Sequence, residues 1–161
     1  MRAATKSKTL ATWIALVGGT LGLHRFYLHG FGDRLGWLFC GPTLLGWHGV
    51  RRMQSLGIDD RLAWLLSPLL GITITIAMLS AIVYGLTSDA EWNRRHNPTR
   101  PAPDAGWAAI VGVIVALALG ATALMATLAF SAQRLFEWQA EPAATAARAP
   151  ARRPGPEPAA T

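Results

Sequence analysis

The residues best able to do chemistry lie together in a short polar stretch between two apolar segments. His24, Arg25, Phe26 and Tyr27 end the first segment, and Asp33 precedes the second. An arginine inside membrane hydrocarbon costs from about 2.5 to more than 10 kcal/mol, so it either has a binding role or extends its charge to the interface. We predict that Arg25 anchors this stretch, the candidate functional turn, at the interface. The alternative is that it binds a lipid headgroup or a partner carboxylate.

No other group of residues has the pattern of a catalytic or metal site. His24, His29 and His48 are potential ligands, but the first two are not at the i, i+4 spacing that places side chains on one helix face. No cysteine or carboxylate cluster accompanies them, so we expect interfacial or pore-side histidines. The hydroxyl residues of the apolar segments have no base beside them. The sequence predicts no enzyme, no metal and no cofactor.

Charge is concentrated between long apolar blocks. The chain has 161 residues, of which 52% are hydrophobic and 15% are charged. Soluble domains carry about 25% charged residues. The net charge of +6 comes from arginines and lysines at the ends of apolar blocks rather than from a basic stripe, so we expect no nucleic-acid partner. The pattern predicts an all-α integral membrane protein with about four transmembrane helices.

Two short apolar segments and two long ones account for these helices. A basic tail, residues 1–8, precedes a hairpin over 9–52 with spans at about 10–28 and 35–50. Both spans are short, and Pro42 interrupts the second, so the hairpin either crosses fully or re-enters. Longer helices are predicted over 62–86 and 107–130, separated by a polar, proline-rich loop over 87–106. The Ala, Pro, Arg and Glu composition of residues 140–161 predicts a disordered tail.

Small residues recur at four-residue spacing in the two long helices. They form one ridge in the third helix and one in the fourth, at Ala77, Ala81 and Gly85 and at Gly112, Ala116 and Gly120. Such ridges allow helices to approach closely in a membrane. We predict that the two ridges pack against each other, with homo-oligomerisation as the alternative. Gly18 and Gly22 form a shorter version in the first segment.

The distribution of basic residues predicts an orientation. Four spans place both termini on one side, together with most of the lysines and arginines. Because cytoplasmic loops are rich in these residues, both termini are predicted to be cytoplasmic. The alanine, arginine and proline content suggests the cytoplasmic (inner) membrane of a bacterium.

The N-terminal third combines several features. It has a basic start at Lys6 and Lys8, a glycine run at Gly18, Gly19 and Gly22, and the string His24, Arg25, Phe26, Tyr27 and Leu28. A glycine-rich turn at Gly30 and Gly32, then Gly36 and the late Trp47, follow. With this combination, residues 6–52 resemble the TM2 domain family. The chain departs from the family pattern at His29 and Arg51. The resemblance implies two closely packed transmembrane helices joined by a short turn, and it does not imply an enzyme.

Two functions follow as hypotheses. The first is a membrane interaction or scaffold module, whose partners are the lipid bilayer and a second copy or another membrane protein. The second is a small oligomeric channel or transporter, which would require Arg25 and His48 to line a water-filled cavity.

Overall fold

The computed structural model describes the backbone of residues 5–148 and the side chains of residues 5–140. This part of the chain is helical throughout, apart from short connections. Its elements are α1 (Lys8–Gly18), the 3₁₀ turn η1 (Gly19–Leu21), α2 (Leu23–His29), α3 (Arg34–Leu56), α4 (Arg61–Leu86), α5 (Asp89–His96) and α6 (Trp107–Arg148). The all-α prediction is therefore confirmed for the described residues.

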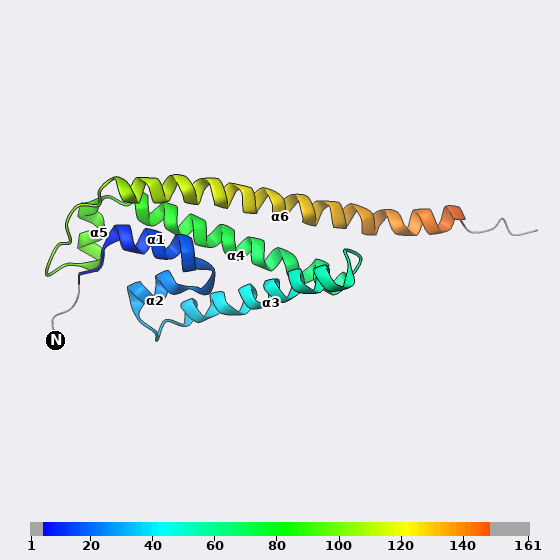
Figure 1. The fold of residues 1–161 in the computed structure, drawn as a ribbon, viewed down its shortest axis with the longest axis horizontal. Coiled ribbons are helices and arrows are strands. Elements are labelled where there is room, and N and C mark those ends of the chain that lie inside the picture. The colour runs from blue at the N-terminus through cyan, green and yellow to red at the C-terminus, as the bar shows by residue number, and fades with distance from the viewer. Residues whose placement is uncertain (1–4, 149–161) are drawn as a thin grey trace, which may run out of the picture.

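The first apolar segment is not one span. Helix α1 ends at Gly18, and Gly22 then adopts a left-handed backbone conformation with φ of 74°. A Cβ atom on Gly22 would lie 2.3 Å from the carbonyl oxygen of Gly36, so only glycine fits this crossing. Helix α2 then runs back towards the start of α1 (Figure 1). The predicted continuous helix over 10–28 is wrong, because the segment forms two helices that reverse direction at Gly22.

Helix α3 is longer than the predicted span over 35–50. Its first turn is capped by the Asp33 side chain, which accepts a hydrogen bond from the Leu35 backbone nitrogen at 3.2 Å. The helix passes through Pro42 and continues to Leu56. The Thr43 hydroxyl donates to the carbonyl of Thr20 in η1 at 2.6 Å, which joins the middle of α3 to the point where the chain reverses.

Two of the described helices are long and apolar enough to cross a membrane by length and composition. They are α4 and the Trp107–Ala140 part of α6. Helix α6 extends to Arg148, well beyond the predicted end at residue 130. The tail predicted to be disordered from residue 140 is therefore helical up to Arg148, because alanine, glutamate, glutamine and arginine all favour helix. The rest of that predicted tail, 149–161, lies outside the described residues.

The predicted loop over 87–106 contains a helix, α5. The Ser88 hydroxyl accepts a hydrogen bond from the Glu91 backbone nitrogen at 3.3 Å, and the first turn carries Asp89 and Glu91. This Ser-x-x-Glu spacing is that of a capping box, a helix start signal. The proline content of 98–103 masked this signal in the sequence.

Small side chains form the centre of the bundle. Ala77 and Ala81 of α4, Ala15 of α1 and Ala116 of α6 are fully buried in one cluster with Met78. Because alanine adds little bulk, the helix backbones approach closely here.

The glycines predicted to pack helices together lie at contacts between different pairs of helices. A Cβ atom on Gly85 would lie 2.2 Å from Val113, and one on Gly120 would lie 2.8 Å from Met78, so both glycines lie between α4 and α6. Gly112 instead faces α1, where a Cβ atom would lie 3.0 Å from Thr12. A Cβ atom on Gly18 would clash with the Leu23 side chain at 2.4 Å. Gly18 and Gly22 therefore permit the chain reversal.

The ends of the bundle are arranged differently from the prediction. Residues 5–8, the turn between α2 and α3, and residues 87–106 all lie at one end, which we call the α5 end (Figure 1). The α3–α4 turn, residues 57–60, lies at the far end, where Arg134 of α6 is within 4.0 Å of Asp59. The N-terminal residues were predicted to lie opposite 87–106, and this is wrong because α1 and α2 reverse at Gly22. Helices α3, α4 and α6 run between the two ends.

Candidate functional site

The arginine of the candidate functional turn is paired within the chain. The Arg25 Nε atom lies 2.6 Å from Asp33 Oδ2, and the side chains are 26% and 14% exposed. The hydrogen bond from Arg25 holds the pKa of the Asp33 carboxyl below its ordinary value. Asp33 also caps α3, so this ion pair fixes the angle at which α3 leaves the turn. The carboxylate that Arg25 contacts belongs to its own turn.

His24 lies inside the bundle and not at an interface. Its side chain is 1% exposed and packs against Phe39 of α3 and Tyr84 of α4, with ring centroids 5.6 and 5.8 Å away. Its Nδ1 atom has no hydrogen-bond partner among the described residues. The predicted interfacial or pore-side position of His24 is therefore wrong. His48 is exposed on α3, so the two histidines do not meet.

Phe26 and Tyr27 have separate roles. The Phe26 ring stacks with Phe31 and contacts Trp37, with centroids 5.5 and 5.2 Å apart, and this cluster covers Gly36. The Tyr27 hydroxyl accepts a hydrogen bond from the Ser7 backbone nitrogen at 2.9 Å. Tyr27 therefore connects the turn to the N-terminal segment.

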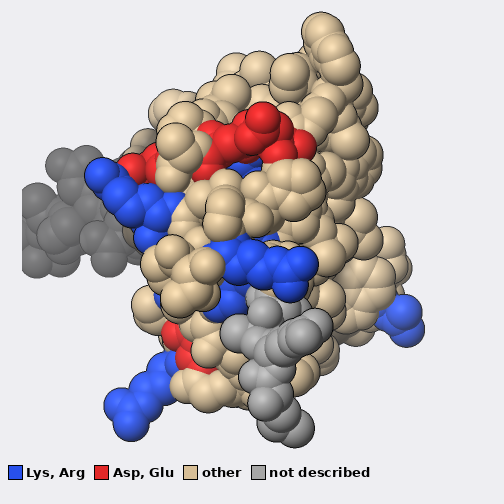
Figure 2. All heavy atoms as spheres, turned by 90° about the vertical axis from the view of Figure 1, so that its left-hand side faces the viewer, with Lys and Arg blue, Asp and Glu red and all other residues tan. Residues whose placement is uncertain are grey.

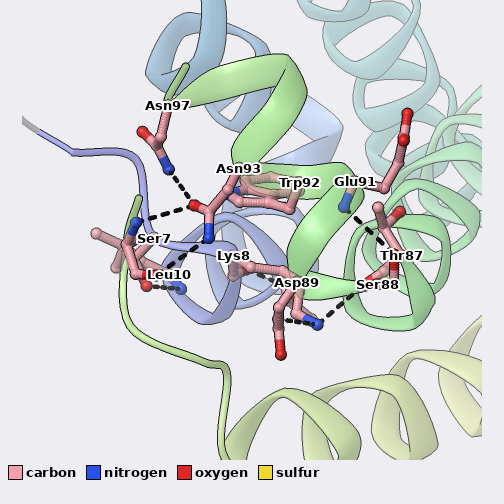
Figure 3. A network of polar contacts seen from close by, with 12 residues as sticks. Ser7, Lys8, Leu10, Thr87, Ser88, Asp89, Glu91, Trp92, Asn93 and Asn97 are labelled. Carbon is pink, nitrogen blue, oxygen red and sulfur yellow. Dashed lines mark hydrogen bonds and ion pairs between the residues drawn. The ribbon is translucent and has the colours of Figure 1, made fainter. Parts of the chain in front are cut away.

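The N-terminal segment is held by a dense set of polar contacts with α5, which we call the clasp: Lys6, Ser7, Lys8, Asp89, Trp92, Asn93 and Asn97 (Figure 3). The Lys6 carbonyl accepts hydrogen bonds from Trp92 Nε1 at 2.8 Å and from Asn97 Nδ2 at 3.0 Å. The Lys6 backbone nitrogen donates to Asn97 Oδ1 at 2.8 Å. Asn97 therefore binds the backbone of residue 6 as a neighbouring β-strand would, through both donor and acceptor.

A salt bridge and a second asparagine complete the clasp. The ammonium group of Lys8 lies 2.6 Å from Asp89 Oδ1 and donates to the Thr87 carbonyl at 2.8 Å. The hydrogen bond from Lys8 lowers the pKa of Asp89. Asn93 binds both backbone groups of Ala102, with distances of 3.1 and 2.9 Å, which folds the 97–106 connection back onto α5.

Trp92 is the buried centre of the clasp. Its side chain is 2% exposed and packs with Ala11, Leu28 and Tyr84, so it joins α1, α2, α4 and α5. Sequence reasoning missed Trp92, Asn93 and Asn97. The capping box at Ser88 was the available signal for α5, whereas nothing local indicated that residue 6 would meet residues 92 and 97.

The outer surface of the α5 end carries both signs of charge (Figure 2). Arg94 and Arg95 are 77% and 67% exposed, and both pair with Glu91. Within the described residues, no three histidine, cysteine, aspartate or glutamate side chains lie close enough together to hold a metal ion. The arrangement at this end binds protein backbone and positions helices, which is the chemistry of a structural joint.

No protein family matches this chain, and no curated protein or solved structure matches it either.

Proposed function

We propose that this chain is a multi-pass membrane protein that acts through contacts with other membrane proteins, with a TM2-type N-terminal region built as a re-entrant hairpin. The observation that carries this proposal is the apolar surface that remains after the bundle has packed. Leu65 and Leu79 of α4 and Ile114 and Leu117 of α6 are between 57% and 68% exposed. Soluble monomers rarely leave so many large apolar side chains exposed to water, whereas lipid or a partner helix would cover them.

Three crossings fit the two polar ends better than four. Helices α4 and α6 are apolar and long enough to span, and α3, which falls short of that apolarity, packs along α4 between the same two ends. Seven lysines and arginines lie at the α5 end, at Lys6, Lys8, Arg25, Arg34, Arg94, Arg95 and Arg100. Up to residue 140, four lie at the far end, at Arg51, Arg52, Arg61 and Arg134. On the positive-inside rule, this excess supports an orientation with the α5 end in the cytoplasm and the C-terminal part of α6 on the opposite side of the cytoplasmic membrane.

An interaction role is supported by what the polar residues do. Arg25 is engaged by Asp33, and the asparagines of the clasp bind backbone groups of the same chain. Arg25 and His48 were the residues that a channel would need in one cavity, and they lie on different elements in different surroundings. The polar groups therefore stabilise one arrangement of helices, which leaves the outward faces of α4 and α6 as the surface available to partners.

The test combines membrane extraction with photo-crosslinking of the full chain in cells. After an alkaline carbonate wash, the protein should stay in the membrane fraction. Photoreactive residues replacing Leu79 and Leu117, each outward-facing, should then give discrete higher-mass products from at least one position. Release by carbonate would refute membrane insertion. Retention with crosslinks to lipid alone at both positions would leave a membrane protein but refute the interaction role.

A further inference from the structure

A charged pocket opens at the far end of the bundle, away from the clasp. It has a volume of about 150 Å³ and is lined by two acids, two arginines and two tryptophans, at Asp59, Glu137, Arg61, Arg134, Trp64 and Trp138. Arg134 is 12% exposed and lies 2.6 Å from Glu137 and within 4.0 Å of Asp59. Glu137 also accepts a hydrogen bond from Gln133 at 2.9 Å, and Asp59 is 97% exposed, so the pocket holds a paired arginine and glutamate with an exposed carboxylate at its edge.

An apolar groove runs between α3, α4 and α6. Its volume is about 270 Å³, and its apolar walls include Val50, Met53, Pro68, Ile74, Ala126 and Phe130. The two hydroxyls in the lining, on Ser67 and Thr127, donate to carbonyls of their own helices at 2.7 and 2.6 Å. A polar ligand would find few partners in this groove, and an aliphatic chain would bury apolar surface there.

The pocket and the groove adjoin each other along two helices. Trp64 and Pro68 are one turn apart on α4, as are Arg134 and Phe130 on α6. The Arg134 guanidinium carbon lies 5.7 Å from the centre of the Phe130 ring, so one cation–π contact joins the charged part to the apolar part. From Arg61 to Ile74 the site follows α4 for roughly 20 Å at about 1.5 Å per residue.

The polarity of this site matches the position of a lipid in the bilayer. The charged pocket lies at the α3–α4 turn, where α4 begins and where two tryptophans are suited to the headgroup level. The groove extends from it along the bundle axis into the apolar part of α4 and α6. With its headgroup in the pocket, a lipid could lay its acyl chain along the groove. The chain would then run in the same direction as the other chains of the leaflet.

The charges in the pocket select among headgroups. Two guanidinium groups complement a phosphate, and two carboxylates complement an ammonium group. An anionic headgroup without an amine would face Glu137 and Asp59 with like charge. We propose that the pocket and groove together bind one zwitterionic glycerophospholipid, with its phosphate at Arg134 and Arg61, its ammonium at Glu137 and Asp59, and one acyl chain in the groove. This inference rests on the membrane insertion proposed above.

The experiment is native mass spectrometry of the full chain, purified from membranes in detergent and titrated with phosphatidylethanolamine or phosphatidylglycerol of the same acyl chains. One molecule of phosphatidylethanolamine should bind in preference to phosphatidylglycerol. Arg134→Gln should weaken that binding by about tenfold or more, the factor expected for one hydrogen bond to a charged group. Glu137→Gln should reduce or reverse the preference for the zwitterionic lipid, because it removes a negative charge beside Arg134.

A matched pair of variants tests the groove. Ala126→Trp fills the groove and should abolish binding, whereas Leu128→Trp adds the same side chain at an exposed position of α6 outside the groove lining and should leave binding unchanged. A thermal melt by circular dichroism without lipid checks that each variant is folded.

Three outcomes of the mass spectrometry would overturn the proposal, and a fourth comes from the thermal melt. They are equal binding of the two lipids by the unsubstituted protein, unchanged binding in Ala126→Trp, and a dimer in the same spectra whose formation Ala126→Trp abolishes. Stabilisation by free phosphoethanolamine equal to that by the lipid would likewise refute a role for the groove. Loss of the protein from the membrane fraction is a different failure, because it refutes membrane insertion before any lipid is added.

Discussion

Trp92 illustrates how one side chain fixes the clasp. It is buried against α1, α2 and α4, and its indole nitrogen donates to the Lys6 carbonyl at 2.8 Å. Trp92→Ala should lower the free energy of unfolding by about 3–5 kcal/mol, the cost of removing a large buried aromatic side chain. Trp92→Phe keeps part of the packing and should lose less than Trp92→Ala but more than about 0.5–1.5 kcal/mol, the net value of one hydrogen bond, because the smaller ring also leaves a cavity.

Denaturant unfolding of the purified protein in mild detergent measures both values. Trp107→Ala is the control, because Trp107 is 80% exposed. Equal losses in Trp92→Ala and Trp107→Ala would contradict the central role of Trp92 in the clasp.

The Lys8–Asp89 pair should make stability depend on pH in the acid range. The pKa of Asp89 is lowered from its ordinary value of 3.8, chiefly by the hydrogen bond from Lys8. A carboxyl with a lowered folded-state pKa stabilises the fold fully above its unfolded pKa, and this contribution is lost as the pH falls through the folded-state value. The contribution is under about 1 kcal/mol, because solvent screens a pair near the surface.

The measurement is the difference in melting temperature between the unsubstituted protein and Asp89→Asn. This difference should be positive at pH 7 and should decrease below about pH 3.8, the ordinary value for aspartate. A difference that stays constant from pH 7 to pH 3 would show that the carboxylate charge contributes nothing to the clasp.

At this scale the sequence identified Arg25 and Asp33 as members of one turn but did not pair them. It also placed His24 at an interface, although the side chain is buried between α3 and α4. A single histidine next to an arginine has no local pattern that reports burial. The position of His24 depends instead on Phe39 and Tyr84, which are far from it in the sequence.

At the scale of elements, the reversal at Gly22 decides the fold of the N-terminal region. Gly22→Ala introduces a side chain at φ of 74° and within 2.3 Å of the Gly36 carbonyl oxygen. The left-handed conformation alone costs about 1–2 kcal/mol for a residue with a Cβ atom, and the clash with α3 should add to that cost.

Alanine substitutions at two other glycines help to separate the cost of the backbone conformation from the cost of the clash. All three variants are compared by denaturant unfolding in mild detergent. Gly30 has φ of 84°, ψ of 173° and open space around it, so Gly30→Ala should show a conformational cost without a clash, in a backbone region that glycine alone adopts readily. Gly32→Ala meets neither problem and should be close to neutral. If Gly22→Ala were as close to neutral as Gly32→Ala, the left-handed turn and the close approach of Gly22 to α3 would not be part of the folded structure.

Long apolar elements were easier to predict than their ends. The third helix was expected over 62–86 and is α4, Arg61–Leu86, since its apolar run and its length agree. The first segment was harder, because an apolar run with glycines is compatible with one helix or with two that reverse. The length of α6 was underestimated. Hydropathy identifies only the part of the helix that is suited to a membrane, whereas the helix continues through the alanine-rich residues that follow.

At the scale of the whole molecule, cysteine labelling can test on which side of the membrane each end of the bundle lies. Single cysteines at Gly32, Ile58 and Ala105, on a Cys40→Ser background, test the α2–α3 turn, the α3–α4 turn and the 97–106 connection. We expect positions 32 and 105 to label from the cytoplasm and position 58 to label from outside intact cells, because three helices separate the two ends.

A cysteine replacing Ser88 in the clasp region should match positions 32 and 105. Labelling of position 105 from outside, with position 32 protected, would contradict the arrangement in which both lie at the α5 end. Membrane preparations of inverted orientation serve as the control, since they should exchange the two patterns.

The clasp also sets the order of events during synthesis. Lys6 meets Trp92 and Asn97, which follow it by 86 and 91 residues. At roughly 5–20 residues per second, the first segment leaves the ribosome about 4–18 seconds before those partners exist. On the proposed membrane arrangement, the first segment stays during that interval on the side where it emerged, and α3 and α4 insert as a pair to bring residue 92 back to it. With α3 and α4 crossing the membrane as proposed, the clasp can close only in chains that have completed both of these crossings.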